Sequence, residues 1–238
     1  MDVLEEKQFH GDVTKHWYYQ SKAKALNKYI QSIHIDSVLD IGAGSGFFSK
    51  YLLKNTDIRK ATCVDIAYKE TTTECINDKQ IEYTKEIVSP NGADLVLLMD
   101  VIEHIEDDLS FLKYVTGNVS SGTWFVVTVP AFQFLWSSHD EFLKHHRRYT
   151  LKSLRKLVAN SGLNVKRINY FYASIFPLAA MMRLVAKMRE NPKLDQSDLR
   201  EHSVFVNSLL SIICSAETNV MNINKLAGLT VFCLCRKE

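Results

Sequence analysis

The sequence predicts an α/β fold in which seven mostly parallel strands form one doubly wound sheet. Three observations lead to this prediction: β-branched and apolar runs alternate with helical patterns, two of the runs are almost wholly apolar, and one run ends in a glycine-rich turn. Apolar runs suit parallel strands that are covered on both faces, and the alternation suits helical crossover connections. The predicted strands are 37–41, 61–66, 81–84, 94–99, 123–129, 164–171 and 229–235.

One segment interrupts the alternation of strands and helices. Residues 172–224 are helical in pattern throughout and rich in Leu, Ile, Met and Phe. We interpret this segment as a helical cap inserted before the last strand, which leaves 37–171 and 225–238 as the core. The predicted crossover helices are 47–55, 107–119 and 151–161.

The composition restricts the class of protein and of partner. The chain has 238 residues, of which 46% are hydrophobic and 24% charged, which suits one globular domain with a modest insertion. The net charge is only +2 and the basic residues are spread along the chain, so nucleic acid is not an expected partner. Five cysteines, mostly within apolar runs, and an N-terminal stretch unlike a signal peptide predict a cytoplasmic protein.

A glycine-rich turn follows the first predicted strand. Gly42, Gly44 and Gly46 allow the backbone to approach a ligand closely. Their spacing differs from the Gly-x-Gly-x-x-Gly of dinucleotide-binding turns, which makes a nucleotide-dependent oxidoreductase the less favoured alternative. Asp40 precedes the turn, where it could bind an ammonium group directly or through water. Asp65 ends the second strand about 20 residues farther on, the separation at which a carboxylate binds ribose hydroxyls in this architecture.

These residues belong to a wider resemblance. At 38–46, at Asp65 and at 93–104 the chain resembles successive motifs of class I S-adenosylmethionine-dependent methyltransferases, in order and in spacing. The resemblance implies S-adenosyl-L-methionine as cofactor and a Rossmann-like methyltransferase fold whose last strand is antiparallel. Glu86 takes the place of the acid that faces the adenine amino group, although 85–87 departs from the family's Asp-Ala pair. The cofactor-binding residues that the resemblance implies are Asp40, Gly42, Ala43, Gly44, Gly46, Asp65, Ile66, Glu86 and Asp100.

The N-terminal region carries a second likeness. Residues 16–22 resemble a segment that precedes the core and folds over the cofactor in related methyltransferases. We therefore predict that 1–36 forms an N-terminal helical segment over the cofactor. The alternative is an aromatic helix that only packs against the sheet.

The least ordinary stretch is 136–150, directly after the fifth predicted strand. Its three histidines, two acids and two arginines would lie above the carboxyl edge of the sheet, and charged groups are seldom buried without partners. The stretch resembles a subgroup of bacterial methyltransferases often found among genes for cell-surface polysaccharide and lipid-linked sugars. The alternative is a solvated loop in which the arginines pair with nearby acids and Thr150 caps the next helix. The resemblance assigns its signature to His139, Asp140, His145, Arg147, Arg148 and Tyr149.

The histidines suggest how an acceptor could be deprotonated. A histidine is the natural base for an oxygen acceptor, which leaves His139 or His145 as candidates, with Asp140 orienting the ring. Asp100, Glu103 and His104 follow the fourth strand, where related enzymes line the cleft, so His104 is the alternative base. No metal is expected, because His145 and His146 are adjacent in the chain and no cysteine lies nearby.

The sequence thus predicts O-methylation of a small-molecule, glycan or lipid-linked acceptor. Arg147, Arg148 and Tyr149 would bind the acceptor, with the arginines holding an anionic group such as a phosphate. N- or C-methylation, and a catalytically silent S-adenosylmethionine-binding or scaffold protein, remain alternatives. The apolar cap 172–224 could touch the inner face of the membrane, form a homodimer interface, close a substrate pocket or simply pack on the core.

Overall fold

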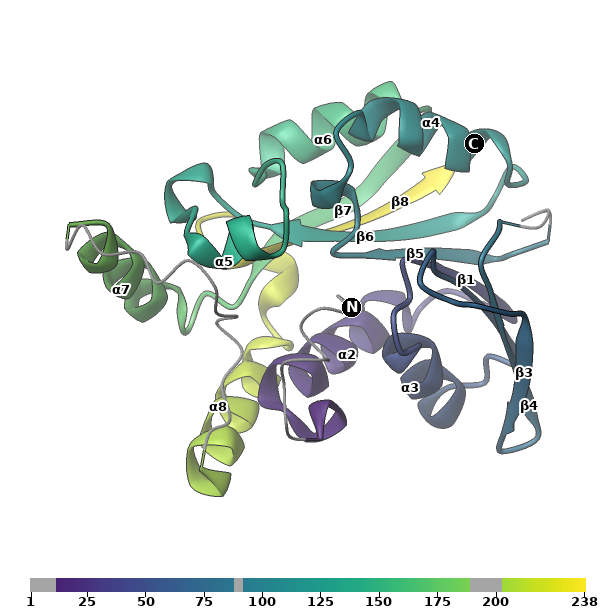
Figure 1. Ribbon diagram of the computed structural model, residues 1–238, viewed down its shortest axis with the longest axis horizontal. Coiled ribbons are helices and arrows are strands. Elements are labelled where there is room, and N and C mark those ends of the chain that lie inside the picture. Colours follow the sequence, from purple (N-terminus) through teal and green to yellow (C-terminus); the bar gives the residue numbers. More distant parts are fainter. Residues whose placement is uncertain (1–11, 88–91, 189–202) are drawn as a thin grey trace.

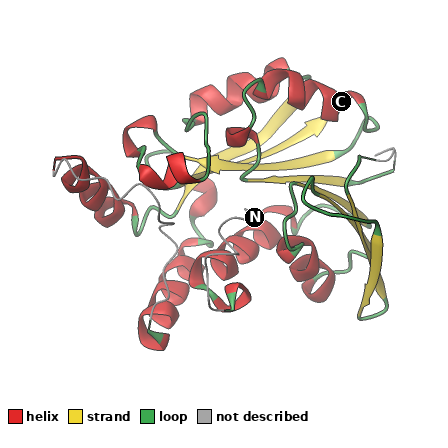
Figure 2. Ribbon diagram, in the orientation of Figure 1, coloured by secondary structure: helices red, strands yellow, loops and turns green. Residues whose placement is uncertain are grey.

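The computed structural model describes residues 12–87, 92–188 and 203–238 and shows an α/β fold of three layers (Figure 1). Helices α4 and α6 cover one face of the sheet, while α2, α3 and α8 lie on the other (Figure 2). The strands are β1 Ser37–Ile41, β2 Lys60–Val64, β3 Thr72–Ile76, β4 Lys79–Thr84, β5 Leu95–Met99, β6 Trp124–Pro130, β7 Leu163–Phe171 and β8 Thr230–Lys237. The α-helices are α2 Trp17–Ile30, α3 Phe47–Asn55, α4 Asp108–Gly117, α5 Ser138–Phe142, α6 Leu151–Asn160, α7 Phe176–Met188 and α8 Val204–Glu217, and the 3₁₀ turns are η1 Val13–Lys15, η2 Ile102–His104, η3 Gln133–Leu135 and η4 Met221–Ile223.

The strand order is β3-β4-β2-β1-β5-β6-β8-β7. Strands β4, β2, β1, β5 and β6 are parallel, so their carboxyl ends share one edge of the sheet. Strand β8 runs antiparallel to both β6 and β7. The predicted α/β class and the antiparallel last strand are therefore confirmed.

The structure adds an eighth strand that the sequence analysis did not predict. Strand β3 forms a hairpin with β4 at one edge of the sheet. Its two-residue turn consists of Asn77 and Asp78, with φ of 51° and 62°. These two residue types tolerate the left-handed backbone that such a turn requires. The strand was missed because most of its residues are exposed and carry no apolar alternation, although the Asn-Asp pair was a readable turn signal.

The central strand β5 explains why the sheet needs helices on both faces. Leu95, Leu97 and Met99 belong to the core on the side of α2 and α3. Val96 and Leu98 belong to the core on the side of α4 and α6. All five are essentially buried, and each buried side chain of this size stabilises the fold by roughly 1.5–3 kcal/mol relative to exposure.

Helix α2 connects the N-terminal segment to the core. Tyr19, Ala23, Leu26 and Ile30 recur at helical spacing and are buried against the sheet. Helix α8 lies beside α2, and Asn207 accepts a hydrogen bond of 2.9 Å from the backbone N–H of Trp17. Residues 1–11 of the predicted N-terminal segment lie outside the described residues.

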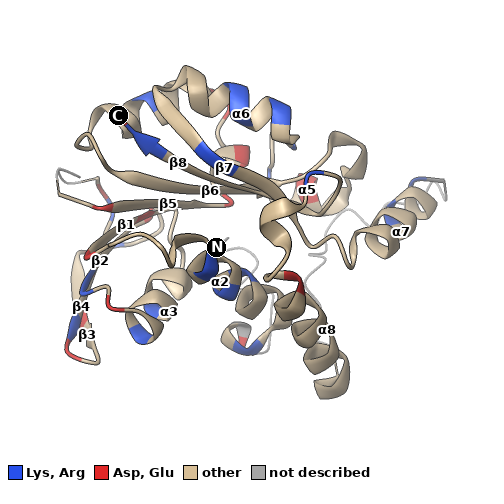
Figure 3. Cartoon of the chain, turned by 180° about the vertical axis from the view of Figure 1, so that it is seen from behind, with Lys and Arg blue, Asp and Glu red and all other residues tan. Residues whose placement is uncertain are grey.

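The described parts of 172–224 are helical, as expected. They comprise α7, α8 and η4, whereas 189–202 lie outside the described residues. Figure 3 shows basic residues along α6, while α8 carries few charged residues. In the part of the chain that the structure describes, no helix combines the length and the apolar character needed to cross a bilayer. The division of the chain into core and cap stays a prediction.

Gly228, in the loop before β8, offers a test of the fold. A Cβ atom at this position would overlap the carbonyl oxygen of Phe171 and lie 2.9 Å from the Cβ of Tyr170. We expect Gly228→Ala to lower the free energy of unfolding by about 1–3 kcal/mol, the usual cost of overpacking, as measured by urea denaturation. The matched control is Gly117→Ala, where a Cβ meets nothing within 4 Å. Equal stability of the two variants would contradict the described packing of this loop.

Candidate active site

The predicted site residues gather at the carboxyl edge of the parallel strands. The loops after β1, β2, β5 and β6 all leave the sheet at this edge. Strand β1 pairs with β2 on one side and β5 on the other, so the chain reverses its winding direction between β1 and β5. Ligands of open α/β sheets bind outside the carboxyl ends at such a switch point.

The glycine turn has a conformation that side chains would disrupt. Gly42 and Gly46 have φ of 70° and 72°, in the left-handed region. A Cβ on Gly42 would lie 2.7 Å from a methyl carbon of Val101, and one on Gly46 would lie 2.9 Å from the ring of Tyr83. The backbone N–H of Gly42 donates to the Val64 carbonyl at 2.8 Å, which holds the turn across the ends of β1 and β2. The glycines therefore form a narrow cradle of bare backbone.

Asp40 lies beneath this turn with an unused acceptor atom. The residue is 1% exposed, and its Oδ2 accepts a hydrogen bond of 2.8 Å from the Ser49 hydroxyl. Among the described residues its Oδ1 has no hydrogen-bond partner. Burial raises the pKa of Asp40 to about 6, the charge of Asp65 acts in the same direction, and the Ser49 hydrogen bond opposes both. A buried acceptor without a donor fits the ammonium group of S-adenosylmethionine.

The loop after β2 presents one acid and one exposed apolar residue. Asp65 accepts hydrogen bonds of 2.9 Å from the backbone N–H groups of Gly44 and Ala67. Ile66, next to it, is 86% exposed, which is a suitable surface for one face of an adenine ring. Tyr68, which the sequence analysis did not single out, donates a hydrogen bond of 2.6 Å to the Gly44 carbonyl. These contacts connect the β2 loop to the glycine turn.

Glu86 and Ala43 complete the inventory of predicted cofactor residues. Glu86 is exposed just beyond β4, and Ala43 is buried within the turn. A hollow of about 330 Å³ lies beside the turn and is bordered by Gly44, Lys50 and Tyr68. The cofactor contacts of these residues stay predictions.

Asp100 ends β5 in a strained backbone conformation, with φ of 57°. Its Oδ1 accepts a hydrogen bond of 3.0 Å from the Thr128 hydroxyl, and its Oδ2 contacts the ammonium of Lys22. Lys22 also donates to the hydroxyl of Tyr18 at 3.1 Å. Burial alone would raise the pKa of Asp100, but the charge and hydrogen bond of Lys22 lower it below the ordinary value. Asp100 is therefore an ionised partner for α2.

The sequence analysis included Lys22 in the stretch 16–22 but gave it no role of its own, although its side chain is fully buried. The available signal was a lysine on the same helical face as Ala25 and Leu26, where a charged residue is out of place. Its pairing with Asp100 holds α2 over the carboxyl edge of the sheet. This position agrees with a segment that covers the cofactor, which stays a prediction.

The acceptor side of the site is built around Asp140, on α5. Its carboxylate is completely buried and contacts the His145 Nδ1 at 2.9 Å. Arg148 donates to both carboxylate oxygens, through Nε at 2.7 Å and Nη2 at 2.9 Å, and the Ser137 backbone N–H donates at 2.9 Å. Burial would raise the pKa of Asp140, but the hydrogen bonds of His145 and Arg148 hold it well below its usual range. Asp140 is thus a fixed carboxylate that orients one imidazole ring.

The three candidate histidines lie at different distances from this pair. The His104 ring packs edge to face on the His145 ring, with 4.6 Å between centroids. The ring of His139 is farther away, 6.5 Å from that of His145. Asp140 therefore orients the ring of His145. Which histidine acts as the base stays a prediction.

Glu103 lies directly before His104, in η2, and the sequence analysis assigned it no role. It is completely buried, and both carboxylate oxygens lack a hydrogen-bond partner among the described residues. Burial and the neighbouring charge of Asp100 raise the pKa of Glu103 well above its usual range. The sequence signal for a buried acid was the position of Glu103, directly after the apolar residues Val101 and Ile102 and before a histidine.

The predicted acceptor-binding residues all have partners within the protein. Arg148 donates to Asp140 and to the Ala131 carbonyl, and its side chain is only 4% exposed. Arg147 contacts Asp108 at 2.7 Å, and the buried Tyr149 donates to the same carboxylate at 2.8 Å. The contacts with Asp108 tie 145–149 to the start of α4. The pairing of Arg148 with Asp140 is the one that the alternative of a solvated loop named. Arg147 retains the most exposure of the three, and a role in binding the acceptor stays a prediction.

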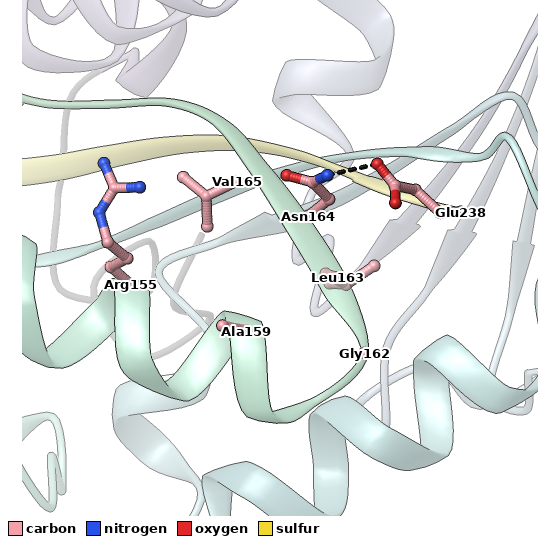
Figure 4. A pocket seen from close by; sticks show the side chains of 7 residues that line it. All are labelled: Arg155, Ala159, Gly162, Leu163, Asn164, Val165 and Glu238. Atoms are coloured by element: carbon pink, nitrogen blue, oxygen red, sulfur yellow. Dashed lines mark hydrogen bonds between the residues drawn. The ribbon is translucent and has the colours of Figure 1, made fainter.

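Another hollow lies away from the glycine turn. It measures about 470 Å³ and is lined by residues of α6 and of the edges of β7 and β8, among them Arg155, Asn164 and Glu238 (Figure 4). The start of β7 and the end of β8 lie at the amino edge of the parallel strands, opposite the predicted site. This hollow holds none of the predicted site residues, and its position does not suit a ligand of this fold.

Comparison with known proteins identifies the kind of domain. A family model described as a methyltransferase domain matches residues 11–168, more than half of the chain. The fold is similar to that of a SAM-dependent methyltransferase from Archaeoglobus fulgidus, with 18% identity, a TM-score of 0.53 and 98% of each chain covered. It is similar to phosphoethanolamine N-methyltransferase 2 of Haemonchus contortus, with 13% identity, a TM-score of 0.50, and 100% of this chain and 61% of that chain covered.

The [4+2]-cyclase SpnF is also similar, with 9% identity, a TM-score of 0.54, and 91% of this chain and 80% of that chain covered. No curated protein matches the chain. At these identities the solved structures establish the fold, and the family match establishes the kind of domain.

We predict that the affinity for S-adenosylmethionine depends on pH through Asp40. The acid must be ionised to attract the ammonium group, and its pKa in the free protein is about 6. Below that pH we expect the Kd to rise by up to about tenfold per pH unit, because binding must first remove a proton from Asp40. Isothermal titration calorimetry between pH 5 and 8 measures this dependence.

Two variants separate this effect from a general loss of binding. Asp40→Asn removes the pH dependence along with part of the affinity, whereas Asp65→Asn weakens binding at every pH and retains the dependence. A wild-type Kd that stays constant from pH 5 to 7 would show that Asp40 does not bind the ammonium group as a carboxylate.

Proposed function

Since the chain belongs to the methyltransferase-domain family and is an S-adenosylmethionine-dependent methyltransferase, we propose that it methylates a hydroxyl oxygen of a glycan or lipid-linked acceptor. When bound, S-adenosylmethionine supplies an electrophilic methyl group on a positively charged sulfur. The protein then has two tasks: to align donor and acceptor, and to remove the proton of the hydroxyl group.

The observation that carries this proposal is the oriented imidazole of His145. Asp140 holds the Nδ1 of this ring at 2.9 Å, which leaves Nε2 as the nitrogen that can meet another group. An oxygen acceptor has to lose its proton during methyl transfer, and a histidine near neutral pKa is suited to that step. A buried carboxylate behind the ring fixes its orientation. We therefore assign the handling of the acceptor proton to the histidines around Asp140.

The cofactor half of the proposal rests on the turn and its two acids. We assign Asp40 to the ammonium group, Asp65 to the ribose hydroxyls and Ile66 to the adenine face. The orphaned Oδ1 of Asp40 and the bare backbone of the turn support these assignments. Helix α2, attached through Lys22 and Asp100, would exclude water from the methyl group.

The nature of the acceptor is inferred from the surface of α7, which is bonded to the η3 loop just before α5. Helix α7 is attached to the η3 loop, because Arg183 donates to the Leu135 carbonyl at 2.9 Å and Lys187 to the Phe134 carbonyl at 2.7 Å. Its outer surface exposes apolar side chains beside these two cations. Such a surface suits a lipid-linked acceptor held at the inner face of the membrane. The exposed apolar residues are Leu178, Met181, Met182, Leu184 and Val185.

The compartment is part of the same proposal. All five cysteines are free thiols, and four of them are buried. Unpaired cysteines suit a reducing compartment, so we place the enzyme in the cytoplasm. Arg147 is our candidate for binding an anionic group of the acceptor, because its side chain is still 32% exposed beside Asp108.

Methyl-labelled cofactor identifies the acceptor. The purified protein is incubated with labelled S-adenosylmethionine and with cell extracts separated into lipids, glycans and small molecules. We expect label in the lipid or glycan fraction as a methyl ether, which hydriodic acid cleaves to methyl iodide. Label in an N-methyl or C-methyl product would overturn the hydroxyl assignment, and cofactor binding without transfer to any fraction would indicate a silent binding protein.

The role of His145 in catalysis can be tested by substitution, with the adjacent His146 as the control position. We expect His145→Gln to lower kcat by about 10²–10⁴-fold, the usual contribution of a positioned acid or base, while the Kd for S-adenosylmethionine stays unchanged. His146→Gln is the matched control, because that side chain is exposed. If the two variants are equally active, the oriented imidazole has no part in the reaction.

A further inference from the structure

We propose that Glu103, His104 and His145 bind one divalent transition-metal cation at the carboxyl edge of the sheet. One ligand atom of each residue lies within 4.8 Å of those of the other two. The binding site is inferred from this geometry alone, whereas the role of the cation in methyl transfer rests on the proposed function.

The buried carboxylate of Glu103 is the strongest observation. Neither of its oxygens has a hydrogen-bond partner among the described residues, although the side chain is completely buried. The nearby ammonium of Lys22 is engaged by Asp100. A buried carboxyl group without a partner is unfavourable, so native proteins pair such groups or use them as metal ligands. A cation between Glu103 and the two histidine rings would satisfy it.

His145 has the support that a metal-binding histidine usually has. Asp140 binds its Nδ1, which leaves Nε2 for a metal and fixes the plane of the ring. Metal-binding histidines commonly donate their second ring N–H to a carboxylate in this way. Asp140 is itself held by two hydrogen bonds from Arg148. Asp140 would therefore be a positioning residue of the site, one step removed from the cation.

The two loops that carry the ligands are joined by the backbone. The N–H of His146 donates a hydrogen bond of 2.7 Å to the carbonyl of Glu103. This bond brings His145 beside His104, with their ring centroids 4.6 Å apart. The three ligands are thus held together by the fold before any cation binds, which reduces the entropic cost of binding.

The set of donor atoms indicates the class of metal. Two imidazole nitrogens and one carboxylate suit Zn²⁺, Mn²⁺ or a similar divalent ion, whereas Ca²⁺ and Mg²⁺ prefer a site made of oxygens. Three protein ligands leave coordination positions open, as in catalytic sites and unlike closed structural sites. An acceptor hydroxyl could occupy an open position.

A bound cation would lower the pKa of that hydroxyl. In the resulting step the O–H bond breaks and its proton passes to His139, whose ring lies 6.5 Å from that of His145. The oxygen forms a bond to the methyl carbon while the carbon–sulfur bond breaks, and the electron pair of that bond stays on sulfur. The products are the methyl ether, S-adenosylhomocysteine and one proton, so atoms and charge balance. With the cation bound, His104 and His145 act as ligands, and His139 accepts the proton in place of His145.

Metal binding can be measured without the acceptor. The full chain is treated with a chelator, freed of it, and titrated with Zn²⁺ and separately with Mn²⁺ by calorimetry, with Mn²⁺ binding also followed by electron paramagnetic resonance. We expect one ion per chain for at least one of the two metals. Glu103→Gln and His104→Gln should each weaken binding at least tenfold, and Asp140→Asn should weaken it about 10–100-fold. His146→Gln should leave the affinity unchanged.

Binding of S-adenosylmethionine serves as the folding control for every variant. If Glu103→Gln or His104→Gln fails to bind the cofactor, His145→Gln is tested in its place. The proposal is overturned if the chelated wild type binds the cofactor but neither metal, or if Glu103→Gln binds the metal as tightly as the wild type. Activity distinguishes the two proposals. Full O-methylation by the metal-free protein would refute the role of the cation and leave the proposed function intact. One bound metal ion per chain together with an N-methylated product would support the metal site and refute the proposed O-methylation.

Discussion

The carboxylate of Asp140 is removed from water and meets the guanidinium of Arg148 through hydrogen bonds of 2.7 and 2.9 Å. Separating such a pair would leave a buried charge uncompensated, which is strongly unfavourable. The pair therefore holds α5 against the 145–149 segment, and with it the ring of His145. The histidines of the site have defined positions because this one ion pair is satisfied inside the protein.

A second buried pair has the same effect on the cofactor side. Lys22 and Asp100 connect α2 to the end of β5, and neither charge has another oppositely charged partner in the described ranges. Asp40 and Glu103 are also buried, but one oxygen of Asp40 and both oxygens of Glu103 have no hydrogen-bond partner among the described residues. The protein thus neutralises the charges that hold its elements together and leaves two acceptors uncompensated at the carboxyl edge. Those two positions are where we place the ammonium group of the cofactor and the proposed metal ion.

The fold alone does not determine the reaction. The [4+2]-cyclase SpnF has a similar fold, so the same sheet supports chemistry other than methyl transfer. The feature of this chain that bears on its reaction is the junction of η2 with the loop after α5, where Glu103, His104 and His145 meet. The bonds of α7 to η3, which precedes α5, connect the proposed lipid surface to the segment that carries the proposed site of transfer.

The sequence by itself determined the α/β class, the strands that build the parallel sheet, the antiparallel last strand and the glycine turn between Asp40 and Asp65. These features follow from short-range patterns, since a strand buried on both faces has to be apolar and a turn without room for a Cβ has to be glycine. The hairpin strand β3 was missed because an exposed edge strand carries no such pattern.

The tertiary structure decided which charged groups meet. Lys22 and Asp100 are 78 residues apart in the chain, and no local pattern couples them. From the sequence, His139 and His145 were equal candidates for the base, and the adjacency of His145 and His146 spoke against a metal site. Only the folded chain shows that Asp140 contacts the ring of His145 and that Glu103 and His104 lie beside this ring. Contacts of this kind depend on how two loops leave neighbouring strands, and that geometry exists only after the sheet has formed.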